Sequence, residues 1–263
     1  MTLINKNHNF EYIKNNQTCI FTIKDFFEEN FYNDLKNNFP KFNKNYLIKN
    51  NHGKYSLHSR TKEYERIVFS NNILTTFHNL IFNENFMKRM YNILRYKILS
   101  SNKENLIRTL KHFRIKKFIF AKEEREHFLD FLISKIKMEL EFSFMINQAK
   151  IVPHVDSIKE IFSLLLYFPT YETQINPMHT IEKEYGTTFW ASKSYNYTNR
   201  HLISHEDEQT FKQKNLVFFK SSFIRNSCCG FVRNDKSWHT VEPLNIKEDY
   251  IRRSININFL LQN

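Results

Sequence analysis

The stretch that decides the fold reads IVPHVDSIKEIFSLLLYF and covers residues 151–168. It places His154 and Asp156 two positions apart, shortly before an apolar run that begins at Ile161. Side chains two positions apart on a β-strand point to the same face of the sheet. The segment therefore predicts a strand whose histidine and carboxylate face one site, followed by a buried strand.

Short segments of the same kind fill the chain after about residue 138. Apolar and aromatic residues alternate with polar ones in them, and polar turn-rich segments separate them. These segments are ELEFSFMINQ, AKIVPHVD, EIFSLLLYF, GTTFWA, NLVFFK, CGFVRN, HTVEP and RRSININFLL. Such a series without intervening helices is typical of an antiparallel sandwich or barrel and not of βαβ units.

The first half of the chain has a different pattern. A strand is predicted for Cys19–Ile23, and helices are predicted for residues 23–40, for 71–99 with breaks at asparagines, and for 121–138. Residues 41–66 are polar and are expected to be irregular. We therefore expect one domain over residues 1–263 of the mainly β class with flanking helices (α+β). Its helical part covers about 1–137 and its β core about 138–263.

Composition limits the class of protein. A hydrophobic share of 41% and 27 phenylalanines indicate a globular chain. Three scattered glycines exclude the glycine-rich phosphate loops of dinucleotide and Walker-type sites. No apolar run is long enough for a membrane helix, and the first residues lack the apolar core of a secretory signal. The three cysteines, two of them adjacent, make a poor disulfide framework, so we expect a reducing, cytoplasmic location.

The formal net charge of +12 permits a nucleic-acid or membrane partner. However, the basic residues are scattered, and the abundance of Lys, Asn, Ile, Phe and Tyr is typical of an AT-rich coding sequence. A small-molecule partner is therefore expected, rather than nucleic acid, and the oligomeric state stays open.

Two further segments lie near the end of the chain. SWHTVEP contains His239, and YIRRSININF places Arg252 shortly after it, at the start of the last predicted strand. The ordered set of His-x-Asp, a distant His and then Arg-x-Ser resembles the Fe(II)- and 2-oxoglutarate-dependent dioxygenases, especially their prolyl-hydroxylase-like branch. GTTFW is similar to that family's Gly-Thr strand, and IKDFFEENFYNDLKNNFP is similar to the first helix of that branch.

The resemblance implies a double-stranded β-helix, or jelly roll, as the core. It also implies that His154, Asp156 and His239 are the catalytic metal ligands. Two imidazoles and one carboxylate leave coordination positions open, which suits Fe(II) that must bind a bidentate co-substrate and O₂. An aspartate at position 156 favours hydroxylation over halogenation, because a halide takes the place of this carboxylate in halogenating relatives.

The co-substrate 2-oxoglutarate has a second carboxylate that a guanidinium can bind through two hydrogen bonds. Arg252 is expected to supply it, with Ser254 on the same face of the strand, whereas Arg253 points the other way. Candidate further donors to the co-substrate are Tyr167 and Asn147. Thr188 and Trp190 are candidates for the substrate mouth, and core packing is the alternative for both.

The expected activity is hydroxylation of a small biosynthetic metabolite, such as an amino acid, a sugar or a natural-product intermediate, with release of succinate and CO₂. A peptidyl hydroxylase of the prolyl type and an AlkB-like nucleic-acid demethylase are alternatives. A jelly-roll binding protein without catalysis is the alternative from another class.

Other groups of residues in the sequence indicate a functional site less strongly. His201 and His205 have the spacing of a helical zinc pair, but no HExxH motif surrounds them. Cys228 and Cys229 have no second cysteine pair to complete a zinc site, and no nucleophile-elbow motif indicates a hydrolase.

Overall fold

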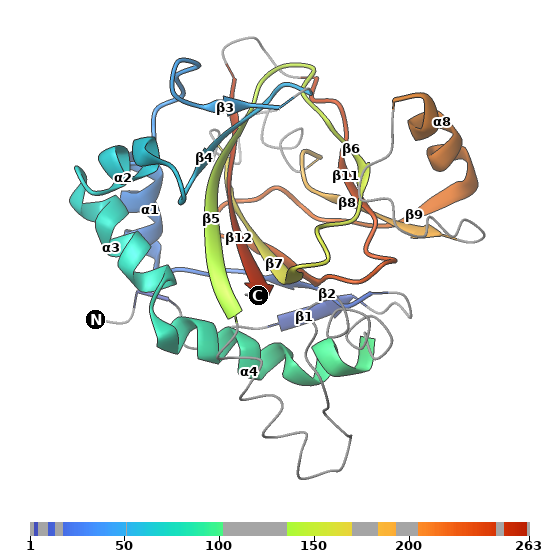
Figure 1. Ribbon diagram of the computed structural model, residues 1–263, viewed down its shortest axis with the longest axis horizontal. Helices are drawn as coiled ribbons and strands as arrows, with labels where there is room; N and C mark the ends of the chain where they lie inside the picture. The colour runs from blue at the N-terminus through green and yellow to red at the C-terminus, as the bar shows by residue number, and fades with distance from the viewer. Residues whose placement is uncertain are drawn as a thin grey trace.

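The protein was analysed as a computed structural model, which describes residues 3–4, 10–13, 18–50, 52–101, 136–169, 184–192, 205–245 and 250–261. Two antiparallel sheets face each other, and helices cover the outer side of the larger one (Figure 1). The architecture is built from the C-terminal strands outward.

Eight strands after residue 135 form the core. They are β5 (Ile136–Met145), β6 (Ile151–His154), β7 (Glu160–Phe168), β8 (Thr188–Ser192), β9 (Asn215–Lys220), β10 (Cys228–Val232), β11 (His239–Val241) and β12 (Arg252–Leu261). The large sheet contains the order β10-β7-β12-β5, and the small sheet has the order β6-β11-β8-β9. From β5 to β12, each strand lies in the other sheet from the one before it, except that β8 and β9 are neighbours in the small sheet. This strand order is a jelly roll, so the predicted fold class is confirmed.

Four N-terminal strands extend the large sheet. β2 (Ile20–Ile23) pairs with β10 and carries β1 (Phe10–Ile13), while β4 (Lys54–His58) pairs with β5 and carries β3 (Ile48–Lys49). The prediction of an irregular segment over 41–66 is therefore wrong for β3 and β4. The part of the chain before the core is also not purely helical.

Helices α1 (Glu29–Asn37), α3 (Asn72–Ile81) and α4 (Glu84–Ser101) fall in the predicted helical segments, and the predicted break within 71–99 lies at Asn83, whose Oδ1 accepts from the backbone N–H of Asn85. Helix α2 (Lys62–Val68) was not predicted, because it begins within the segment 41–66. Thr61 and Asn71 cap α2 and α3 through side-chain oxygens that accept backbone N–H bonds. α8 (His205–Lys214) contacts the small sheet instead.

Two predicted helices need correction at their ends. α1 begins at Glu29 and not near residue 23, because β2 runs to Ile23 and Asp25 adopts a positive φ of 51°. Residues 121–135 of the other helix lie outside the described residues, and 136–138 belong to β5, whose ladder with β12 extends to Ile136. Within the described part of the chain, no helix is both long and apolar enough to cross a membrane.

An aromatic core joins the helices to the large sheet. Phe142 of β5 is fully buried, and its ring centroid lies 5.2 Å from that of Phe39 and 6.1 Å from those of Tyr64 and Phe77. Rings from three separate segments thus meet on one strand. The helices and the jelly roll therefore share a single hydrophobic core.

The opposite face of the same strands, which faces the small sheet, is largely polar. Strand register aligns three rows across β4, β5 and β12: Lys54, Met145 and Arg252; Ser56, Ser143 and Ser254; His58, Glu141 and Asn256. Glu141 is paired with Lys54, and its carboxylate oxygens lie 3.5 Å from His58 Nε2 and 3.3 Å from Asn256 Nδ2. A polar interior costs free energy in a sandwich, and it is typical of one that holds a polar ligand.

Truncation of the shared core should destabilise the whole chain. We expect Phe142→Ala to lower the free energy of unfolding by about 3–5 kcal/mol, because it removes a buried ring that three segments contact. Val217→Ala, at a side chain that is 51% exposed, should change it by less than about 0.5 kcal/mol. Urea denaturation followed by circular dichroism measures both.

The same core bears on the prediction of a single domain over 1–263. If the helical and β parts fold together, calorimetry should give one transition whose calorimetric and van't Hoff enthalpies agree. Two resolved transitions in the wild-type protein would show that the two parts are separate domains.

Candidate metal centre

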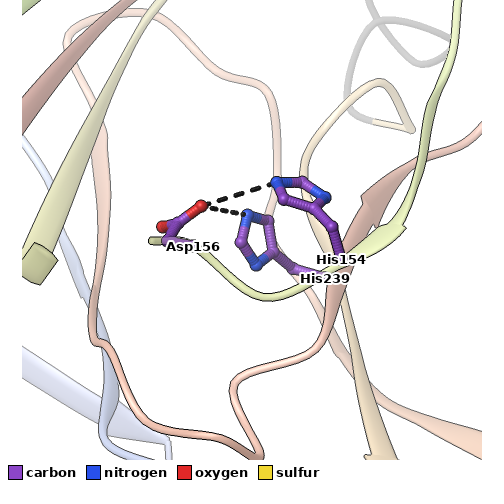
Figure 2. Close-up of side chains that lie close together, drawn as sticks. All are labelled: His154, Asp156 and His239. Carbon is purple, nitrogen blue, oxygen red and sulfur yellow. Dashed lines mark ion pairs between the residues drawn. The ribbon is translucent and has the colours of Figure 1, made fainter. Parts of the chain in front are cut away.

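Three side chains meet between the two sheets. His154 is the last residue of β6 and His239 is the first of β11, and these two residues are direct partners in the strand ladder. Their ring centroids lie 4.2 Å apart, and their Nε2 atoms lie 3.5 and 3.6 Å from the same oxygen, Oδ1 of Asp156 (Figure 2). One ligand atom from each residue lies within 4.8 Å of the others.

Asp156 reaches this cluster from outside the strand. β6 ends at His154, so the prediction that both residues share a strand is wrong for Asp156. The carboxylate is held by other contacts. Ser163 Oγ of β7 lies 3.4 Å from its Oδ2, and Nε of the buried Arg233 donates to its backbone carbonyl at 3.1 Å.

Both imidazoles are oriented by backbone carbonyls. The Nδ1 atom of His154 lies 3.0 Å from the carbonyl of Val152, and that of His239 lies 2.9 Å from the carbonyl of Ser237. A carbonyl can only accept, so Nδ1 carries the proton in each ring. In the neutral tautomer, Nε2 then presents its lone pair towards the cluster, which is the arrangement that metal-binding histidines use.

The charges of the three groups suit a cation. Burial, together with the nearby His154, lowers the pKa of His239 to about 4. Burial opposes ionisation of Asp156, but the two imidazoles outweigh it and hold its pKa well below the usual range. Near neutral pH, His239 is thus uncharged and Asp156 is a carboxylate. Three lone-pair donors that face one another repel unless a cation lies between them, so the donor set fits a metal ion.

A second carboxyl group lies beside Asp156. Glu160, at the start of β7, shares Ser163 with it, since Ser163 Oγ is 3.4 Å from Glu160 Oε2. Burial and the charge of Asp156 raise the pKa of Glu160 to about 9, which leaves it protonated near pH 7. Glu160 and Arg233 could not be predicted as part of the site, because neither belongs to a recognisable motif.

Arg252 is a buried cation, with 3% of its surface exposed. Its Nε donates to the carbonyl of Tyr185 at 2.7 Å, and its Nη1 lies 3.3 Å from Ser254 Oγ. The guanidinium carbon lies 4.7 Å from the ring centroid of Phe223 and 5.7 Å from that of Tyr167. Burial lowers its pKa, and no acidic side chain of the described residues forms an ion pair with it. A buried guanidinium without a counter-ion indicates a site for an anionic ligand.

The neighbouring arginine points the other way, as predicted for alternate residues of a strand. The guanidinium carbon of Arg253 lies 5.3 Å from the ring centroid of Phe39, on the side that the helices cover. It is therefore half-buried against α1 and its following segment, and not simply exposed to solvent.

The two co-substrate candidates differ in placement. Tyr167 is buried beside Arg252, and its hydroxyl is engaged by Ser221 Oγ at 2.7 Å and Thr187 Oγ1 at 3.2 Å. Asn147 lies half-buried in the turn after β5.

The substrate candidates Thr188 and Trp190 flank Phe189, whose ring lies 5.8 Å from that of His239. They therefore project from the opposite face of β8, and Trp190 Nε1 donates to Thr240 Oγ1 at 3.0 Å. This placement gives no support to a role in the substrate mouth.

Of the competing constellations, His201 lies outside the described residues, and His205 begins α8. Cys228 and Cys229 are buried free thiols on β10, and Cys19 is also free.

Comparisons with known proteins found distant likenesses among solved structures. No protein-family model and no curated protein matches the sequence. Solved structures similar to the chain include a prolyl-4-hydroxylase from Pseudomonas putida, with 11% identity, 93% coverage of both chains and a TM-score of 0.43. HygX from Streptomyces hygroscopicus, with nickel and 2-oxoglutarate bound, has 8% identity, coverage of 93% and 84%, and a TM-score of 0.47.

A third similar structure is the epimerase SnoN in complex with Fe³⁺, α-ketoglutarate and nogalamycin RO. It has 7% identity, coverage of 94% of this chain and 82% of the other, and a TM-score of 0.49. All three likenesses are distant. The fold assignment therefore rests on the strand order of the two sheets, and the chemistry rests on the side chains.

Removal of a ligand should abolish tight metal binding. We expect His154→Ala and Asp156→Ala each to weaken Co(II) binding by more than the roughly 10- to 100-fold that loss of an outer partner costs. The matched control is His78→Ala, because His78 packs between α2 and α3 and bonds Tyr64 at 2.9 Å. Isothermal titration measures the affinities. Equal losses in His154→Ala and His78→Ala would place the metal elsewhere.

Proposed function

We propose that this protein is an Fe(II)- and 2-oxoglutarate-dependent oxygenase that hydroxylates a small polar metabolite. The observation that carries the proposal is the buried Arg252, which has no ion-pair partner among the described residues, inside the same sandwich that holds the three converging lone-pair donors. The three lone-pair donors fit a bound cation, and the buried guanidinium fits a bound anion. A divalent metal chelated by a dicarboxylic keto acid satisfies both.

His154, Asp156 and His239 would hold the iron. Together they supply three donors, which leaves positions for the co-substrate and O₂. When bound, iron with 2-oxoglutarate supplies O₂ activation, and the overall reaction releases succinate and CO₂ as one oxygen atom enters the substrate. The chain's own contribution is to hold these donors still. The carbonyls of Val152 and Ser237 orient the rings, Ser163 holds the Asp156 carboxylate, and Arg233 holds the Asp156 backbone carbonyl.

Arg252 would bind the far carboxylate of 2-oxoglutarate. Its Nε is already committed to the Tyr185 carbonyl, which fixes the plane of the guanidinium, and Phe223 covers one side of it. Ser254, one pleat further along β12, can donate its hydroxyl to the same carboxylate. Tyr167 forms part of the wall, with its hydroxyl engaged by Ser221. Asn147 remains a candidate donor.

The polar inner face of β4, β5 and β12 supports a polar substrate. Lys54, Glu141 and His58 lie on that face: Lys54 shares a row with Arg252, and His58 and Glu141 share a row with Asn256. Groups of this kind recognise hydroxyl, amine or carboxylate substituents better than hydrocarbon. A small metabolite is therefore favoured over a lipid.

The test of the co-substrate site is an anaerobic titration. Fe(II) and then 2-oxoglutarate are added to the purified protein, and the visible charge-transfer band of the chelate is recorded. We expect a band in the wild type and none in Asp156→Ala. In Arg252→Ala, half-maximal absorbance should need at least about 30-fold more 2-oxoglutarate than in the wild type, because the far carboxylate of the co-substrate loses its charged partner.

Arg253→Ala is the matched control and should titrate like the wild type. A folded wild-type protein that gives no band would refute the oxygenase. A shift confined to Arg253→Ala would move the anchor by one residue.

The substrate class has a separate test. Succinate release by the iron-loaded protein should rise above the substrate-free rate with a pool of amino acids and sugars. It should not rise with proline-containing peptides or with methylated oligonucleotides. Stimulation by peptide alone would indicate a peptidyl hydroxylase, and stimulation by oligonucleotide alone would indicate a demethylase. A charge-transfer band without any succinate release would favour a binding protein.

A further inference from the structure

The two strands that carry the metal ligands are joined by a short ladder. β11 has only three residues, and it pairs with β6 at His239–His154 and Val241–Ile151, with a shift of register between the two pairs. Asp156 lies beyond the end of β6. Strand pairing alone therefore leaves the third ligand, and the angle between the two strands, weakly determined.

A second contact holds these segments from behind. Val155, which lies between two of the ligands, and Trp238, which precedes the third, are 3% and 2% exposed. They form a separate apolar cluster with Trp190 of β8 and Phe211 of α8. The ring centroid of Phe211 lies 5.2 Å from that of Trp238 and 5.7 Å from that of Trp190. The residues adjacent to all three ligands thus pack on one cluster, and α8 supplies a fully buried ring to it.

Ion pairs connect the same helix to both ligand strands. Glu208 of α8 pairs at 2.6 Å with Lys150, the residue before β6, and at 3.0 Å with Lys212 one turn further along α8. Lys212 also pairs at 2.7 Å with Glu242, the residue after β11. Figure 1 shows α8 beside the small sheet, away from the large one. The helix therefore bridges β6 and β11 on the side opposite the ligands.

We propose that Phe211 and Lys212 of α8 are positioning residues for the metal centre. Phe211 holds the Val155 and Trp238 side chains, and through their backbones it sets the separation of Asp156 and His239. Lys212 ties the end of β11 to the helix that also holds the start of β6. Neither residue contacts the metal site itself. This inference rests on the proposed metal centre and assigns a further task to residues outside it.

The physical reason is geometric. A metal ion requires its three donors at set distances, and donors on two short segments can drift apart when the cluster behind them loses a ring. Loss of Phe211 should therefore weaken metal binding more than its effect on overall stability explains. An equally buried phenylalanine elsewhere provides the comparison.

The experiment measures Co(II) affinity and the visible Co(II) spectrum of the full chain, together with the thermal unfolding of the metal-free protein. Phe211→Ala is compared with Phe77→Ala, since Phe77 is also 0% exposed and lies among the helices. Lys212→Met is compared with Lys88→Met, because Lys88 forms an i,i+4 pair with Glu84 at 2.7 Å. Phe211→Leu is included as a milder change in case Phe211→Ala does not fold.

We expect Phe211→Ala to weaken Co(II) binding by about 10- to 100-fold, with altered visible bands, and Phe211→Leu to do so to a smaller extent. Lys212→Met should weaken binding by up to about fivefold, as befits a partly exposed pair. Phe77→Ala and Lys88→Met should lower thermal stability at most and leave affinity and spectrum unchanged.

Two outcomes are distinct. If the wild type binds Co(II) and the α8 variants bind it as tightly, or only as weakly as their matched controls, the positioning role is overturned and the metal centre stands. If the wild type does not bind Co(II), or binds it without regard to His154, the metal centre and the positioning role fall together.

Discussion

Three lone-pair donors that face one another inside a protein make up the constraint on which the rest of this structure depends. His154, Asp156 and His239 place two Nε2 atoms 3.5 and 3.6 Å from one carboxylate oxygen, and a cation between them would stabilise this arrangement. The contacts around these three side chains hold them close together. Carbonyls hold the rings, a serine holds the carboxylate, a buried arginine holds the Asp156 backbone, and the strand ladder places the histidines opposite each other.

The jelly roll distributes polarity in an unusual way to satisfy this constraint. On the large sheet, the outer face is aromatic and packs on the helices, while the inner face bears serines, a paired glutamate and the buried Arg252. In most sandwiches the inner faces are apolar and form the core. Here the inner face is polar over β4, β5 and β12, while an apolar cluster that includes Phe189 and Phe231 fills another part of the space between the sheets. The helices cover the outside of the large sheet and form a second, aromatic core with it.

Sequence reasoning succeeded where a short pattern carries the information. The alternation in the C-terminal strands predicted an antiparallel sandwich or barrel, and the family resemblance implied a jelly roll. The ordered set of His154, Asp156, His239 and Arg252 identified residues that the fold does bring to one interior. Strand ends are different, because β6 stops where its pairing with β11 stops, and that depends on residues far along the chain. β4 was missed for a related reason. Its inward face bears the polar residues Lys54, Ser56 and His58, and a segment with so many polar residues is typical of a loop.

The faces of β8 could not be assigned either, since alternation separates two faces without saying which is inner. Thr188 and Trp190 lie on the face of β8 that points away from the candidate metal centre, because Phe189 between them faces His239. Arg233 and Phe211 contact residues that are far away in the sequence, and no local sequence pattern predicts such contacts.

The chain has two tryptophans, and both belong to the apolar cluster directly behind the candidate metal centre. Trp238 is the neighbour of His239 in sequence, and Trp190 bonds Thr240 on the other side of that histidine. Intrinsic tryptophan emission from this protein is therefore a local signal. The emission reports on the small sheet and α8, and it does not report on helices α1–α4. A paramagnetic ion bound at the centre would therefore quench the emission even though the overall fold had not changed.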